Sequence, residues 1–284
     1  RGGRDWFDGG KFIAVHQHLT TPGNSLVGDT WTNMTIGLSR ALIAEERLKL
    51  EVKEGNAAAQ DAVYEMVAMK AYINMMILDN WGLVFKKSAT NEKSEILRGQ
   101  DAVSYLEKEL LSVRDVIKSD KGPGRLNQFS VKALLARLYL NAAVYRDPYG
   151  TPNFKKEDMD NVIKYTNEII AGPYALSPEY FDIFSDNNST NRELIFAMDQ
   201  RGVLQTEHQR WQYWSISGDQ VPRPEFPNTR GTDAAAMTTD FYQTWVDAYG
   251  SVDPAVADAL KKRIEQKPDL VIRRVFLAIL AQAE

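Results

Sequence analysis

Residues 124–140 read GRLNQFSVKALLARLYL, and this stretch decides which kind of fold to expect. After a short polar link, apolar residues recur every three or four positions, which is the period of an α-helix with one buried face. Ser130 is a residue type favoured at helix N-caps, so we expect it to begin a helix over 131–145. The residues expected on the buried face are Val131, Leu135, Leu138, Ala142 and Tyr145.

The same helical period recurs in four other segments, separated by links rich in glycine, proline and asparagine. These segments are 31–53, 57–81, 101–119 and 157–171. A short segment at 177–184 is expected to pair with the last of them. Successive hairpins that each carry one apolar face predict a stack with a continuous core, as in tetratricopeptide repeats.

The expected fold class is therefore mostly α, with stacked helical hairpins, long irregular loops and minor β. Only 193–198, ELIFAM, has the pattern of a short strand. Residues 239–249 are expected to be helical again, and 251–284 to form a helical tail with no assigned role. Trp31 and Trp81 fall on the apolar faces or ends of helices, so we expect both in the core.

Composition excludes several classes of function. The chain has 284 residues and a formal net charge of −4, which argues against a nucleic-acid partner because such partners demand a basic face. It contains no cysteine, so disulfides, thiolate metal sites and cysteine nucleophiles are excluded. No apolar run reaches the length of about 18 residues that a membrane-spanning helix requires.

Four stretches, taken in chain order, resemble the SusD/RagB family of nutrient-binding proteins. The first is 68–85, AMKAYINMMILDNWGLVF, a helix ending in an aromatic-glycine turn. The second is 124–140, in which a Gly-Arg pair precedes the Ala/Leu-rich helix. The third and fourth are 162–184, VIKYTNEIIAGPYALSPEYFDIF, and 191–198, NRELIFAM. The sequence departs from the family where Lys70 and Phe85 stand at about the positions of the usual arginine and proline.

The resemblance implies a non-catalytic protein that binds oligosaccharides and delivers them to a TonB-dependent porin of the SusC type. It also implies a location on the outer membrane at the cell surface, with a lipid anchor upstream of this chain. Because the chain opens with Arg1 and carries no signal sequence, we expect it to be processed or cropped. It is expected to form one SusD-like domain over 1–284, with a scaffold at 31–184 and a loop-rich, ligand-facing part at 1–30 and 185–250.

Sugar binding requires flat aromatic faces together with polar groups that reach hydroxyls. The cluster Arg210-Trp-Gln-Tyr-Trp214 offers this combination in a stretch without helical period. The residues expected to contact ligand are Arg210, Trp211, Tyr213, Trp214, Trp6, His18 and Asn24. The alternative is that the aromatic residues hold loops against the helices and that the polar residues satisfy turns and caps.

Other kinds of site are not supported by the sequence. His16 and His18 lack a third ligand placed by spacing, so no metal site is expected, and no cofactor motif is present. The four glutamates Glu45, Glu46, Glu107 and Glu109 are expected on solvated helix faces. Two other functions remain open: a tetratricopeptide-like scaffold that binds a protein partner, and a helical glycoside hydrolase, whose paired carboxylates need meet only in the fold.

Overall fold

The computed structural model describes residues 8–185, 187–198, 240, 243–244 and 247. The chain divides into two compact units, one of which comprises Pro22–Ile183 and Ser189–Asp199. The other unit includes the described elements η1 (Asp8–Gly10) and α1 (Lys11–His16). The larger unit contains α2 to α6 and both strands.

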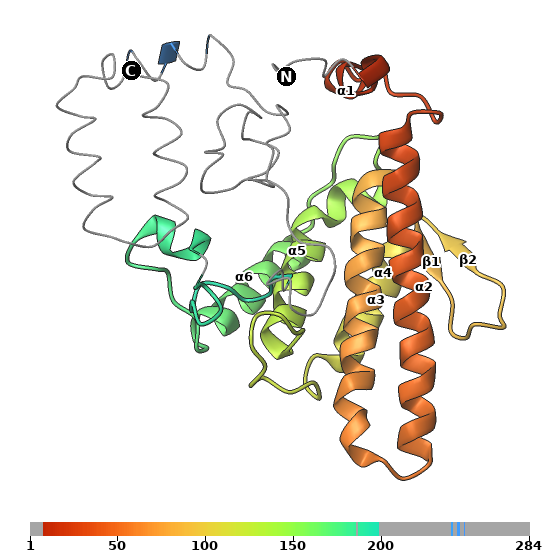
Figure 1. Cartoon of the computed structure of the whole chain (residues 1–284), viewed down its shortest axis with the longest axis vertical. Coiled ribbons are helices and arrows are strands. Elements are labelled where there is room, and N and C mark those ends of the chain that lie inside the picture. Colours follow the sequence, from red (N-terminus) through yellow and green to blue (C-terminus); the bar gives the residue numbers. More distant parts are fainter. Residues whose placement is uncertain (1–7, 186, 199–239, 241–242, 245–246, 248–284) are drawn as a thin grey trace, which may run out of the picture. The chain divides into compact units, whose positions relative to one another are not determined.

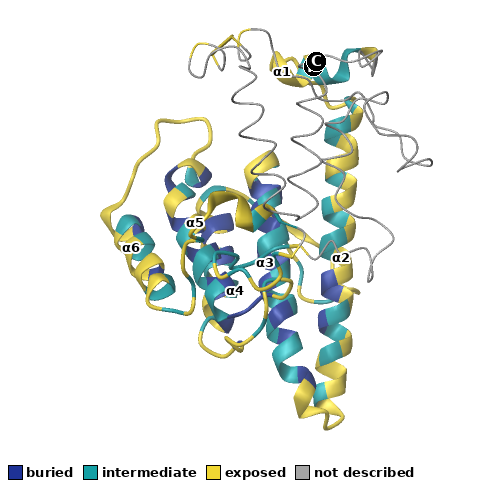
Figure 2. Ribbon diagram, turned by 60° about the vertical axis from the view of Figure 1, so that its left-hand side comes forward, coloured by how far each residue is buried: buried dark blue, intermediate teal, exposed yellow. Residues whose placement is uncertain are grey.

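The larger unit is a stack of antiparallel helices with one small hairpin of strands (Figure 1). Each helix packs against the next in chain order, from α2 to α6, and Figure 2 shows the same succession. Its elements are α2 (Ser25–Lys53), η2 (Ala57–Ala59), α3 (Gln60–Trp81), β1 (Val84–Lys86), β2 (Glu95–Leu97), α4 (Gly99–Val113), α5 (Gln128–Arg146) and α6 (Lys156–Ile170). The short 3-10 helix η3 (Tyr180–Phe184) follows them in the chain.

The core lies where α3, α4 and α5 face one another, and the buried positions are concentrated there in Figure 2. The expected apolar face of α5 is buried at every position, and Leu135 and Leu138 are completely inaccessible to solvent. Full burial of each such side chain stabilises the fold by about 1.5–3 kcal/mol before the opposing entropy is counted. The structure therefore confirms the mostly helical, stacked-hairpin prediction for the described residues.

Two helix starts differ from the sequence prediction because asparagine side chains cap them. The helix predicted over 31–53 begins at Ser25, since the Asn24 side chain accepts a hydrogen bond from the backbone N–H of Leu26 at 2.9 Å. Ser130 is the third residue of α5 and does not cap it alone. Asn127 is the N-cap, and its side chain and that of Ser130 form a reciprocal capping box.

The strand prediction was wrong. Residues 193–198 form turns and bends, and the strands of the described chain are instead β1 and β2, which pair antiparallel with Phe85 opposite Ile96. Backbone groups of the 191–198 segment hydrogen-bond to loops and to no neighbouring strand among the described residues. The segment therefore does not form a strand, although its apolar residues alternate. The partner expected at 177–184 is the 3-10 helix η3 and so is shorter than a full helix.

Candidate ligand-binding site

Most residues predicted to contact ligand lie outside the described residues. These are Trp6, Arg210, Trp211, Tyr213 and Trp214. The helix predicted at 239–249 lies largely outside them as well, although its described residues are helical.

The two described candidates differ in what surrounds them. His18 follows α1, is exposed and adopts a positive φ of 57°, so its imidazole is available to solvent. The amide oxygen of Asn24 is already engaged in capping α2. These residues fall in different compact units, and each is considered by itself.

Residues 191–198 lead towards the predicted aromatic cluster and are fixed to the scaffold at several points. The backbone N–H of Ala197 donates to the carbonyl of Pro123 at 2.7 Å. The ring of Phe196 packs edge-on against Tyr72 of α3, with centroids 5.5 Å apart. The Glu193 carboxylate accepts from the backbone N–H of Ser177 at 2.9 Å. These contacts fix the position of residues 191–198 relative to the helices of the larger unit.

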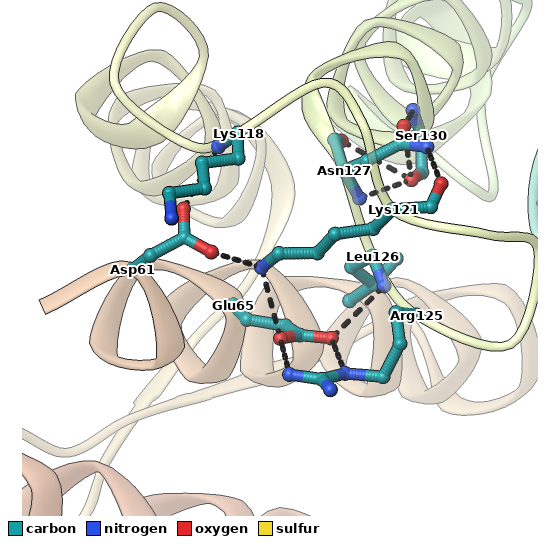
Figure 3. Close-up of polar contacts among 8 residues, drawn as sticks. All are labelled: Asp61, Glu65, Lys118, Lys121, Arg125, Leu126, Asn127 and Ser130. Carbon is teal, nitrogen blue, oxygen red and sulfur yellow. Dashed lines mark hydrogen bonds and ion pairs between the residues drawn. The ribbon is translucent and has the colours of Figure 1, made fainter. Parts of the chain in front are cut away.

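The loop that receives Ala197 is itself held by an acidic pair on α3 (Figure 3). Glu65 accepts hydrogen bonds from Arg125 Nε at 2.7 Å, from Lys121 Nζ at 3.1 Å and from the backbone N–H of Leu126 at 3.1 Å. Asp61, one helical turn earlier, accepts from the backbone N–H of Lys118 at 2.8 Å and pairs with Lys121. This group of contacts is called the α3 acidic anchor below.

Glu65 remains ionised in this setting although it is only 3% exposed. Burial by itself would raise the pKa of Glu65, but the hydrogen bonds from Arg125 and Lys121 outweigh it and hold that pKa below its ordinary value. The same balance lowers the pKa of Asp61, with burial opposed by Lys121 and by the Lys118 backbone. The Gly-Arg pair at 124–125 is thus part of a tertiary contact that joins the start of α5 to α3.

Sequence reasoning missed this anchor, although it left a weak signal. Asp61 and Glu65 are four residues apart on α3, and Lys121 and Arg125 are four apart in the loop before α5. The spacing places Asp61 and Glu65 on one face of α3, but nothing local in the sequence indicates which basic residues contact that face. The pairing is across about sixty positions and exists only in the folded chain.

Glu45 is buried, which corrects the prediction for that residue, whereas Glu46, Glu107 and Glu109 are partly exposed and contact neighbouring elements. Glu45 is 3% exposed, and its Oε2 lies 2.5 Å from the ammonium of Lys70 on α3. Glu46 accepts from the backbone N–H of Thr90 at 2.6 Å, and Glu107 from the hydroxyl of Tyr139 at 2.5 Å. Burial raises the pKa of the fourth, Glu109. Their partners come from α3, from α5 and from the loop between the two strands.

Trp31 and Trp81 were expected in the core and prove to be half-buried. They pack edge-on against each other with centroids 5.1 Å apart, and Trp31 also meets Phe85 at 5.6 Å. The three rings join α2, the end of α3 and β1. Their role in the described structure is to join these elements.

The described residues contain no cluster of three or more histidine or acidic side chains suited to a metal ion. The charged side chains that are buried in the described residues pair with opposite charges: Glu45 with Lys70, Glu65 with Lys121 and Arg125, and Asp158 with Arg146.

Comparison with solved structures identifies this architecture. A SusD superfamily protein from Bacteroides vulgatus superposes with a TM-score of 0.56 at 14% identity, over 69% of this chain and 42% of that one. The chain has the SusD fold. Surface glycan-binding protein A from Bacteroides uniformis shares this fold with a TM-score of 0.64 at 17% identity, over 86% of this chain and 52% of its own.

A second protein of that name with the SusD fold, from Bacteroides thetaiotaomicron and in complex with laminarihexaose, superposes with a TM-score of 0.64 at 19% identity. The match covers 94% of this chain and 58% of that protein. The chain thus spans between 42% and 58% of the length of these three SusD-fold structures. No family model matches the sequence, and the comparison with curated proteins finds no match.

Proposed function

We propose that this chain is part of a non-catalytic protein that binds oligosaccharides at the cell surface and delivers them to a TonB-dependent transporter of the SusC type. The observation that carries the proposal is the SusD fold shared with two surface glycan-binding proteins at a TM-score of 0.64. One of those proteins was solved with laminarihexaose bound. A lipid anchor upstream of this chain would hold the protein at the outer membrane. Among the described residues, no helix has the length and apolarity needed to cross a bilayer.

The ligand would be held by the aromatic cluster at 210–214, assisted by Trp6 and His18. Trp and Tyr rings offer large rigid faces for the C–H side of a pyranose, and Arg210 offers donors to its hydroxyls. Residues 191–198, which precede this cluster in the chain, are held against the scaffold through Ala197 and Phe196. Asn24 is a weaker candidate because capping already uses its amide oxygen.

A screen of the full chain against immobilised glycans, followed by calorimetry on the strongest binder, tests the proposal. We expect saturable binding to at least one neutral oligosaccharide. If no glycan in a screen that includes plant, fungal and host polysaccharides binds, the proposed function is wrong. The same outcome would return attention to a protein partner for the helical stack.

A further inference from the structure

A pocket of about 330 Å³ opens between α2, α3, α4 and the loop joining β1 to β2. It lies wholly within the larger compact unit. This volume is at the lower end of the range of small-molecule sites in proteins. One wall is apolar, formed by Leu38, Leu42 and Ile43 of α2 and by the ring of Phe85. Such a wall suits the C–H face of a small ring.

The pocket is also lined by polar groups with unused hydrogen-bonding capacity. The ammonium of Lys70 has three donors, and its charged neighbours in the described chain are Glu45 at 2.5 Å and Glu109 at 4.0 Å. The Lys70 side chain is only 8% exposed and lines the pocket, so an N–H that does not contact Glu45 or Glu109 can donate to a group in the pocket. The hydroxyls of Tyr105 and Ser39 also line the pocket and have no hydrogen-bond partner among the described residues.

The charges around the pocket balance. Lys70 and Lys87 line it, while Glu45 and Glu109 stand behind Lys70. Lys49 pairs with the second oxygen of Glu45 at 2.6 Å, and Glu46, the next residue of α2, interacts with Lys87 and Lys49, so three cations face three carboxylates. A cation would meet the two ammonium groups that line the pocket, and an anion would compete with the carboxylates that these groups already face. A neutral ligand avoids both costs.

The pocket walls are fixed in place. The Asn74 side chain forms two hydrogen bonds with the backbone of Phe85, donating to its carbonyl at 3.1 Å and accepting from its N–H at 2.9 Å. The loop after β1 is tied to α2, because Glu46 accepts from the backbone N–H of Thr90. A pocket whose walls are held in this way requires little ordering when ligand binds.

We propose that this pocket, which is lined by none of residues 210–214, is a binding site for a neutral polyhydroxylated ring the size of one sugar unit. Lys70 donates to a ring or hydroxyl oxygen, Tyr105 and Ser39 exchange hydrogen bonds with neighbouring hydroxyls, and the apolar wall receives the C–H face. The proposal rests on the proposed function only in taking sugars as the natural source of such rings.

Calorimetric or NMR titration of the full chain tests this site with glucose, xylose and myo-inositol as neutral probes. Glucuronate and glucosamine serve as charged rings of the same size. We expect the neutral rings to bind with dissociation constants near the millimolar range, about −4 kcal/mol, and more tightly than either charged ring. Tighter binding of glucuronate or glucosamine, or no detectable binding of any neutral ring, would overturn the assignment.

Two variants locate the binding. Tyr105→Phe removes one hydroxyl and keeps the ring, and we expect it to weaken binding about fivefold, the loss of one hydrogen bond. Ser39→Trp fills the pocket from its α2 side and should abolish binding. The matched controls are Tyr149→Phe, at a residue that is 99% exposed, and Ser112→Trp on the exposed face of α4. Both controls should bind like the parent chain.

Failure of this proposal is distinguishable from failure of the proposed function. If oligosaccharides bind but folded Ser39→Trp takes up monosaccharide as the parent does, the pocket assignment is wrong and the glycan function stands. If no oligosaccharide binds but myo-inositol binds and Ser39→Trp abolishes it, the pocket stands and the glycan function falls. Circular dichroism of each variant confirms that a loss of binding is not a loss of fold.

Discussion

Replacing Glu65 by glutamine tests whether the α3 acidic anchor holds the start of α5 in place. Glu65 lies on α3, is 3% exposed, and accepts from Arg125, Lys121 and the Leu126 backbone. Glutamine keeps the size of the side chain and one carbonyl acceptor but removes the charge. The substitution therefore isolates the electrostatic part of the anchor with little change in packing.

The expected loss of unfolding free energy depends on what each hydrogen-bond partner of Glu65 can contact after the substitution. Breaking a buried ion pair outright costs about 3–5 kcal/mol, because it strands a buried charge. Here the Arg125 side chain is 61% exposed and regains water, and Lys121 keeps Asp61 as a partner. The glutamine carbonyl can still accept from the Leu126 N–H. We therefore expect Glu65→Gln to lower the free energy of unfolding by about 2–3 kcal/mol, below the full cost.

Urea unfolding at pH 7 measures the difference, with Glu92→Gln as the control. Glu92 is exposed in the loop between the strands, so the same substitution there should change the unfolding free energy by no more than about 0.5 kcal/mol. If the two variants unfold at the same urea concentration, the anchor does not stabilise the fold and the reasoning fails.

The pH dependence gives a second check. Because the folded chain holds the pKa of Glu65 below its ordinary value of 4.5, this stabilisation is present above pH 4.5 and is lost as the pH falls through the lower, folded-state pKa. The difference between the parent and Glu65→Gln should therefore shrink in acid. A difference that stays constant down to about pH 2 would contradict the charge-based explanation.

Three further outcomes are expected. Leu138→Ala should lower the free energy of unfolding by about 2–5 kcal/mol, because Leu138 is fully buried. Leu140→Ala, at a half-exposed residue of the same helix, should lower it much less. Equal denaturation curves for the two variants would mean that Leu138 is not in the core. Trp211→Ala or Trp214→Ala should each weaken glycan binding at least about tenfold, ~1.4 kcal/mol, with the thermal midpoint unchanged. A lowered midpoint with affinity falling in step would instead mean that these rings hold their loop in place, and unchanged affinity in both variants would dismiss the cluster. Reducing-sugar assays should detect no cleavage of any bound glycan; release of shortened oligosaccharides that a single carboxylate substitution abolishes would contradict a purely binding role.

The helices of the scaffold were predictable because their signal is local. A face such as Val103, Leu106 and Leu110 repeats with the period of the helix itself, and all three residues are buried as expected. The start of α2 was misplaced because Asn24 lies before any apolar repeat. The strands β1 and β2 are three residues each, too short for a period to identify them.

The candidate site was only partly accessible to the same reasoning. The aromatic cluster at 210–214 stands out by residue type and remains a prediction, since it lies outside the described residues. The pocket beside Lys70 gave no sequence signal, because its lining comes from α2, α3, β1, α4 and the loop between the two strands.

The sequence by itself determined which segments are helical and which of their faces are apolar, since hydrophobic period and breaking residues act within a few positions of each other. Only the tertiary structure decided how the charges are used. Glu45 and Lys70 are 25 positions apart and Glu65 and Arg125 are 60 apart, yet each pair meets with little or no water around the carboxylate. On an isolated helix both glutamates would be solvated, as was predicted for Glu45. Stacking places a second helix or loop over them, and the cost of removing a carboxylate from water is then offset only by a partner that the fold brings from a distant part of the chain.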